Sequence, residues 1–342
     1  MRIIDGYYCL KNLRDKTTPK YAFDENKDFE RQKSAIGEKF IELLGFDKIK
    51  ENDCPKNVEI ENTVQKDGYK QIRFVFESEK GHFVPAYLLI PDGLPKGNKL
   101  PVAIVLQGHS SGFHLSINEP RNEEEAEYAK DRAALAVQAV QNGFIALAIE
   151  QRGMGENKPQ TDRFCWRDST LALMLGRTII AERVWDISKA IDCLYDFPEC
   201  DTEKILVTGG SGGGTATYYA ACYDKRIKLA VPVCAFCSYK ASIMEPIHCF
   251  CNYIPNAYLN FEMQDLATLI APTDMIIVTG KTDEIFPLHG VEEGYETVQK
   301  IYKKANCEDK CELIVTPKGH YWCVDIIWEA IKKRAFTMGW FH

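Results

Sequence analysis

Short apolar runs alternate with longer helix-compatible segments along most of the chain, a pattern that predicts an α/β fold. The apolar runs end at glycine, proline or polar residues, and they predict strands at 58–64, 72–76, 83–90, 101–106, 144–149, 205–207, 224–233, 275–279 and 311–316. The runs before residue 91 follow one another through glycine turns, so we expect two or three antiparallel strands there. The later runs are apolar at consecutive positions and are separated by helical segments, which predicts a parallel sheet buried on both faces.

Helical periodicity accounts for much of the remaining chain. Residues 1–55 are mostly polar, and an apolar stripe over 29–44 predicts a packing helix that stops at Gly45. Further helices are expected at 123–142, across 160–198, from about 215, at 291–304 and from about 324. We therefore predict an N-terminal helical extension over 1–55 and an α/β domain over 56–342. Its mostly parallel central sheet is flanked by helices and carries a cap-like insertion at about 235–270, after the sixth strand.

Composition and charge narrow the choice of ligand. Of the 342 residues, 45% are hydrophobic and 27% are charged, as in an ordinary soluble globular protein with a sizeable core. The net charge of -7 and the lack of a lysine and arginine cluster argue against a nucleic-acid partner. No stretch reaches the roughly 18 apolar residues that a membrane helix needs, and the N-terminus does not resemble a secretory signal. We expect a cytoplasmic protein with a small-molecule or neutral-polymer ligand and no membrane partner; its oligomeric state is not predicted.

Thirteen cysteines are many for a chain of this length. In a reducing compartment they stay as thiols. Three close pairs invite a zinc interpretation, namely Cys234-x-x-Cys237, Cys249-x-Cys251 and Cys307-x3-Cys311. No two of these pairs combine into a zinc-ribbon spacing, so we predict no metal site and inert thiols instead. A disulfide within 234–251 is the alternative if the protein is exported.

A glycine-rich turn carries the strongest chemical signal in the chain. Residues 204–221 consist of an apolar run, the sequence Gly209-Gly-Ser-Gly-Gly, and an alanine-rich helical segment. A strand that turns into a helix within one residue strains that residue, and glycines on either side remove the collision with the crossing chain. No register of the cluster gives G-x-G-x-x-G or a P-loop, which argues against nucleotide binding. The segment resembles the nucleophile elbow of the α/β-hydrolases, with Ser211 as the nucleophile.

That resemblance implies an oxyanion hole made by two backbone amides. The amide of Gly212, at the start of the helix, is the first candidate donor. The second is expected in the loop after the strand at 101–106, where the sequence Gln107-Gly-His109 follows. We assign the backbone amide of His109, although its side chain could instead line the pocket or belong to an ordinary loop.

The other catalytic groups are expected in the order serine, acid, histidine. Asp283 lies four residues beyond the strand at 275–279, whereas Asp274 precedes that strand and lies at the wrong edge of the sheet. Glu284 is adjacent and competes with Asp283. His320 is the histidine in the loop after the final strand, so it is the expected general base.

A long segment rich in aromatic residues lies where ligand-binding insertions belong, at the carboxyl edge of the sheet. Within 235–270, we predict that Tyr239, His248 and Tyr253 contribute to the wall of the substrate pocket, together with Trp322 beside the catalytic histidine. The alternative is that these side chains pack the insertion onto the body of the protein.

Four motifs together narrow the resemblance within the superfamily. They are Glu150-Gln-Arg-Gly-Met-Gly, Gly209-Gly-Ser-Gly-Gly-Gly, the segment 271–283 and Gly319-His-Tyr-Trp, spread over a chain that resembles the family from about residue 83 onward. They look most like the acetyl-xylan esterase and dienelactone-hydrolase-like branch, although Ser211 replaces the cysteine of true dienelactone hydrolases. In the first motif we expect Arg152 to fix the loop rather than to contact substrate.

The resemblance implies a serine hydrolase that cleaves carboxylic esters, including deacetylation of a carbohydrate or small molecule, without a cofactor. A small peptidase or amidase of the same fold and a catalytically silent binding module are the alternatives.

Overall fold

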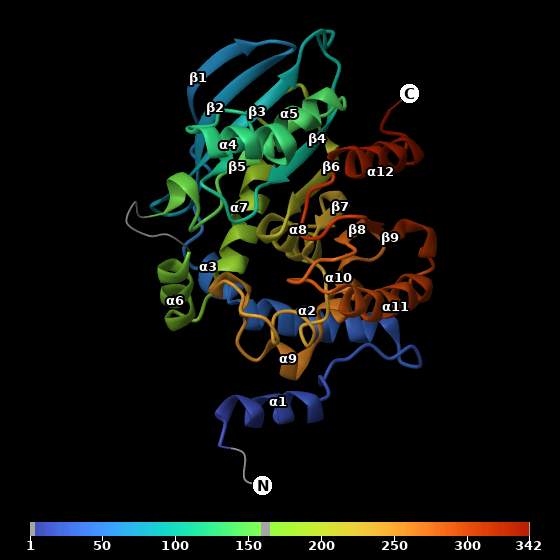
Figure 1. The fold of residues 1–342 in the computed structure, drawn as a ribbon. Coiled ribbons are helices and arrows are strands. Elements are labelled where there is room, and N and C mark those ends of the chain that lie inside the picture. The colour runs from blue at the N-terminus through green and yellow to red at the C-terminus, as the bar shows by residue number, and fades with distance from the viewer. Residues whose placement is uncertain (1–3, 159–164, 342) are drawn as a thin grey trace.

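A single nine-stranded sheet forms the centre of the molecule (Figure 1). The computed structural model describes residues 4–158 and 165–341. The strand order is β1-β2-β3-β5-β4-β6-β7-β8-β9. The first three strands are antiparallel to their neighbours, including the β3–β5 pair, and every pair from β5–β4 to β8–β9 is parallel. The predicted α/β-hydrolase fold is confirmed.

The strands are β1 (Glu59–Lys66), β2 (Tyr69–Glu79), β3 (His82–Pro91), β4 (Leu100–Leu106), β5 (Ile145–Ile149), β6 (Cys200–Gly210), β7 (Ile227–Val233), β8 (Asp274–Gly280) and β9 (Cys311–Thr316). The main helices are α1 (Gly6–Lys16), α2 (Phe29–Leu44), α3 (Phe46–Lys50), α4 (Glu123–Tyr128), α5 (Leu135–Gln141), α6 (Trp166–Met174), α7 (Ile179–Leu194), α8 (Gly212–Tyr223), α9 (Ala257–Asn260), α10 (Ala267–Ile270), α11 (Leu288–Lys304) and α12 (Val324–Thr337). Among the described residues, no helix combines the length and the apolar character needed to cross a bilayer.

Three predicted features need correction. The chain has three antiparallel strands before residue 91, so the insertion follows β7, the seventh strand rather than the sixth. The helix expected at 123–142 is interrupted at Ala134, whose ψ of 55° cannot continue an α-helix into α5. The helix expected across 160–198 is two helices, because the chain turns at Gly176 (φ 71°) before α7 begins. Residues 159–164 lie outside the described part of the chain.

Helices cover both faces of the central parallel strands, which explains the continuous apolar runs in the sequence. Val102, Ile104 and Leu106 of β4 pack into the core formed with α2, α3, α7 and α8. Ala103 and Val105, which point the other way, pack into the core formed with α5 and α12. A strand buried on both sides favours apolar residues at consecutive positions, so the period-two alternation disappears.

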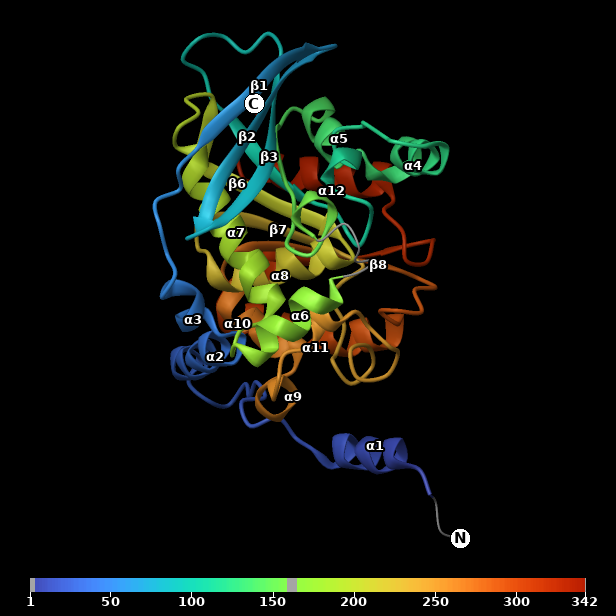
Figure 2. The same ribbon diagram turned by 90° about the vertical axis from the view of Figure 1, so that its left-hand side faces the viewer.

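The N-terminal helices α2 and α3 pack against α8 and α7, which cover one face of the sheet. Helix α2 buries Ile36, Phe40 and Leu44, and Phe40 stacks on Tyr219 of α8 with ring centroids 6.1 Å apart. It ends at Gly45, whose φ of 79° is a left-handed C-cap, as the sequence predicts. Helix α1 lies apart from the sheet beside the insertion (Figure 2).

Candidate active site

Ser211 lies at the tight turn between β6 and α8. Its φ of 54° and ψ of -121° fall outside the regions that non-glycine residues normally adopt, which indicates a strained backbone. Its amide donates to the carbonyl of Val233 at 2.9 Å, so the neighbouring strand β7 holds the turn. A Cβ atom at Gly209 would lie 2.3 Å from the carbonyl oxygen of Leu106, and one at Gly213 would lie 2.0 Å from it. The two flanking glycines of the G-x-S-x-G motif therefore allow β4 to pass against the turn.

Asp283 and His320 form a hydrogen-bonded pair beyond the ends of β8 and β9. The distance between His320 Nδ1 and Asp283 Oδ2 is 2.8 Å. The other oxygen of Asp283 accepts from the amides of Ile285 and Phe286 at 2.8 and 3.0 Å. Burial favours the neutral acid, but the hydrogen bond and the charge of His320, with these two amides, hold the pKa of Asp283 below its ordinary value. The ring of Phe286 stacks on His320 at 5.9 Å and limits the orientations of the imidazole.

The predicted nucleophile and the predicted general base line the same cavity. Its volume is about 180 Å³, and Ser211, His320, His109 and Trp322 all line it. Gly212 opens α8, where the first amides of a helix have no intrahelical acceptor, so its N–H is available to an anion beside Ser211. The indole nitrogen of Trp322 donates to Gln138 Oε1 at 3.1 Å, which fixes the ring against the cavity.

Three residues predicted for the pocket wall lie elsewhere. The described residues that line the cavity do not include Tyr239, His248 or Tyr253. Tyr239 is 3% exposed and bonds through its hydroxyl to Tyr219 inside the core, because the insertion turns its aromatic rings inward. Tyr239 and Tyr253 also border an apolar groove beside α1 that does not include Ser211.

His248 is buried in the insertion, behind the catalytic pair. Its Nε2 lies 3.1 Å from Ser242 Oγ, and its ring meets Phe286 edge-on at 5.4 Å. Burial, with a smaller contribution from the nearby His320, lowers the pKa of His248 to about 4. A neutral imidazole held in this way supports Phe286 and does not reach the cavity.

The turn after β5 is built from buried polar groups. Arg152 makes two contacts of 2.8 Å with Asp186 and one of 2.6 Å with Glu79, which ties the turn to α7 and β2. These contacts agree with a structural role for Arg152. Glu150 is fully buried and accepts from the amides of Phe113 and Glu156 at 3.2 and 3.1 Å. Burial raises the pKa of Glu150 to about 7.

Sequence reasoning did not single out Tyr128 and Arg132 as cavity residues, although both line the cavity. They come from the segment where α4 gives way to a short π-helix, and the sequence shows an ordinary helix there. The wide turn of a π-helix is common at functional sites, but its position cannot be inferred from apolar periodicity. A second wall of the cavity was therefore missed.

The chain matches the model of the Abhydrolase family over residues 1–174, which is half of its length. It is 24% identical over 251 residues to "Putative hydrolase YtaP" of Bacillus subtilis (strain 168), covering 72% of this chain and 81% of that protein. Among solved structures, it superposes on a "putative acetyl xylan esterase" from Bacteroides fragilis NCTC 9343 with a TM-score of 0.79 and 17% identity, covering 97% and 96% of the two chains.

A glucuronoyl esterase from Solibacter usitatus superposes with a TM-score of 0.63 and 14% identity, covering 89% of this chain and 93% of that one. At these identities the structural likeness establishes the fold, while the family match does not extend to Ser211, Asp283 or His320. The fold and the family match lead to the same assignment: this chain belongs to the Abhydrolase family.

Proposed function

We propose that this protein is a serine hydrolase that cleaves carboxylic esters through an acyl-enzyme on Ser211. The observation that carries the proposal is that Ser211 and His320 line one cavity while His320 Nδ1 lies 2.8 Å from Asp283. Because Nδ1 is bonded to Asp283, Nε2 is the ring nitrogen that remains to accept the proton of Ser211. The strained turn at Ser211 adds support, since strain of this kind concentrates at reactive positions.

In this mechanism His320 Nε2 accepts the proton of Ser211 as Oγ attacks the ester carbonyl. The oxyanion accepts hydrogen bonds from the amides of Gly212 and His109, each contributing about 3 kcal/mol to transition-state stabilisation. The C–O bond to the alcohol then breaks, and His320 returns the proton to the leaving oxygen. Water, deprotonated by the same imidazole, hydrolyses the acyl-enzyme and releases the acid.

The shape of the site favours a small acyl group on a polar alcohol. The cavity at Ser211 has a volume of about 180 Å³, slightly more than the roughly 150 Å³ of a cavity that binds one benzene ring, so it suits a small acyl group. It shares His109, Ser110 and Tyr128 with a larger cleft of about 850 Å³. That cleft also presents Asn122, Glu124 and Glu127, hydrogen-bonding groups suited to hydroxyls.

An acetylated carbohydrate or a similar small polyol ester is therefore the substrate class we propose. The proteins of similar fold include a "putative acetyl xylan esterase" and a glucuronoyl esterase, and both names agree with this choice.

Labelling with a fluorophosphonate tests the nucleophile. One label per chain on Ser211, lost in Ser211→Ala, is the expected result, together with a burst of p-nitrophenol from p-nitrophenyl acetate. Folded wild-type protein that gives neither label nor burst would favour a silent binding module instead.

A substrate panel separates the remaining alternatives. We expect acetylated sugars to be hydrolysed faster than longer acyl esters, uronic-acid methyl esters and aminoacyl amides, with Ser211→Ala as the blank. Preference for aminoacyl amides would instead indicate a small peptidase of the same fold.

A further inference from the structure

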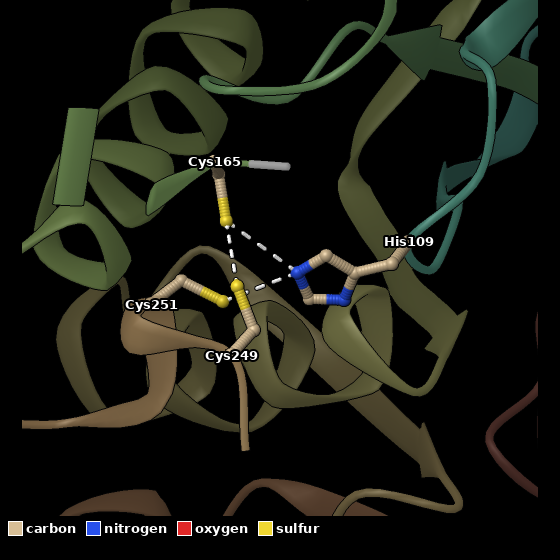
Figure 3. A group of neighbouring side chains, drawn as sticks. All are labelled: His109, Cys165, Cys249 and Cys251. Carbon is tan, nitrogen blue, oxygen red and sulfur yellow. Dashed lines mark hydrogen bonds between the residues drawn. The ribbon is translucent and has the colours of Figure 1, made fainter. Parts of the chain in front are cut away.

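Four potential metal ligands from three separate parts of the chain converge beside the candidate active site (Figure 3). His109 belongs to the loop after β4, Cys165 immediately precedes α6, and Cys249 and Cys251 belong to the insertion. One ligand atom from each of the four lies within 4.8 Å of all the others. A second group, Cys234 with Asp283 and His320, contains the proposed catalytic pair and belongs to the site already described.

The two distances from the imidazole to sulfur are close to those of a tetrahedral metal site. His109 Nε2 lies 3.6 Å from Cys165 Sγ and 3.3 Å from Cys251 Sγ. Zinc bonds of about 2.3 Å to sulfur and about 2.0 Å to nitrogen place tetrahedral N and S ligands about 3.6 Å apart. The Cys165 and Cys249 sulfurs are 2.9 Å apart, so they have to separate by about 1 Å to reach the sulfur–sulfur edge of such a site.

The electrostatic surroundings suit a negatively charged metal–thiolate centre. Arg183 is 1% exposed, and its Nε and Nη2 donate to the carbonyl of Arg152 at 3.0 and 2.8 Å. Within the described residues its Nη1 has no hydrogen-bond partner, and the charge of the guanidinium faces the sulfur atoms of Cys251 and Cys165. Three thiolates around a divalent cation carry one net negative charge, which a single buried arginine neutralises.

We propose that His109, Cys165, Cys249 and Cys251 bind one Zn²⁺ in a closed tetrahedral site. All four positions are filled by protein ligands, which is the pattern of a structural rather than a catalytic zinc. Binding releases the thiol protons to solvent as the thiolates coordinate the ion. The three cysteine ligands come from the start of α6 and from the insertion, so the ion ties both to the loop after β4.

The site reaches the candidate active site through His109. A Cβ atom at Gly212 would lie 3.0 Å from His109 Nδ1, so the imidazole rests against the first residue of α8. With Nε2 on the metal, the side chain and its loop are held in place beside Ser211. The zinc thereby positions the loop that we assign to the second oxyanion donor, without touching substrate.

The test uses the 342-residue chain without a histidine tag, purified with a reductant and loaded with Zn²⁺ before desalting. We expect one zinc per chain by elemental analysis in wild type and in Cys54→Ser, a control that removes a half-buried cysteine outside the cluster. Cys249→Ser should weaken zinc binding at least about tenfold in competition with a chromophoric chelator. Even the loss of a residue that only hydrogen-bonds to a metal ligand lowers metal affinity by about that factor. Neither measurement depends on catalytic activity.

A second measurement keeps the proposal testable if Cys249→Ser does not fold. Wild-type protein loaded with Co²⁺ should show the intense visible bands of tetrahedral cobalt and thiolate-to-cobalt charge transfer, and X-ray absorption of the zinc form should show three sulfurs and one nitrogen. Reduced wild-type protein that binds no stoichiometric zinc, or zinc that Cys249→Ser retains unchanged, overturns the proposal. So does a Cys165–Cys249 disulfide found by peptide mapping in protein that binds no metal.

Discussion

Asp283 Oδ2 lies 2.8 Å from His320 Nδ1, and the second carboxylate oxygen is held by two backbone amides. The carboxylate therefore cannot rotate away from the imidazole without losing those two bonds. Such an anchored acceptor selects the tautomer in which Nδ1 carries the proton and Nε2 is free to act as a base.

Replacing this acid by its amide should disable the base while leaving the fold intact. In Asp283→Asn the amide can donate to Nδ1 and favour the opposite tautomer, so we expect kcat on p-nitrophenyl acetate to fall roughly 10³- to 10⁴-fold. KM should change little. Glu284→Gln, which alters the adjacent exposed carboxylate, is the matched control and should retain activity. Equal losses in both variants would point away from Asp283 as the acid.

The crossing of β4 over the nucleophile turn leads to a second prediction. A Cβ atom at Gly213 would lie 2.0 Å from the carbonyl oxygen of Leu106, which is backbone and cannot move aside. We expect Gly213→Ala to lower the free energy of unfolding by about 3 kcal/mol or more. Gly210→Ala is the control, because its Cβ would meet Trp322 at an ordinary 3.6 Å. Denaturant unfolding of the two variants compares them directly, and similar midpoints would contradict this account of the motif.

The parts of the site that sequence could predict are those fixed by local geometry. The glycines around Ser211 encode a strand-to-helix turn within a few residues, and Asp283 and His320 follow the ends of identifiable strands. Parallel strands end at one edge of the sheet, so residues distant in sequence can be assigned to one place.

The parts that could not be predicted depend on contacts between distant segments. Tyr239 shows the same aromatic character whether it lines a pocket or bonds to Tyr219 in the core. Cys249-x-Cys251 is visible in the sequence, but its meeting with Cys165 and His109 follows from how the insertion folds back over α6. Spacing along the chain carries no information about such a meeting.

Glu150 should make stability depend on pH. Burial raises its pKa from 4.5 to about 7, so the folded state keeps a proton that the unfolded chain loses above about pH 4.5. The free energy of unfolding should therefore fall as pH rises from about 4.5 to 7, by about 3 kcal/mol from this group. Chemical denaturation at pH 5, 6 and 7 measures the slope, and Glu150→Gln should flatten it.

The comparison with Glu150→Gln is needed because other buried acids titrate in the same range. Burial also raises the pKa of Glu262 to about 7 and that of Asp265 to about 6. Their contribution is common to both proteins, so the difference between the two slopes isolates Glu150. Gln107 Oε1 has no hydrogen-bond partner among the described residues. If the Gln107 amide flips, this oxygen can accept a hydrogen bond from the amide that Glu150→Gln introduces. Parallel slopes would mean that Glu150 ionises at its ordinary pKa.

Replacing Arg152 should lower the free energy of unfolding far more than replacing an exposed basic residue that also forms an ion pair. Burial opposes the charge of Asp186, yet the Arg152 guanidinium holds the pKa of that carboxyl well below its usual range. The carboxylate of Glu79 lies 2.6 Å from the same guanidinium. Arg152→Met would leave three buried carboxylates, those of Glu79, Glu182 and Asp186, without this cation. We expect a loss of about 3–5 kcal/mol in the free energy of unfolding. Lys48→Met breaks an exposed ion pair with Glu51 at the end of α3 and should lower the denaturant midpoint far less. Denaturant midpoints at pH 7 measure both losses, and a mild effect of Arg152→Met would show that Arg177, the other arginine on Glu79, compensates for the missing charge.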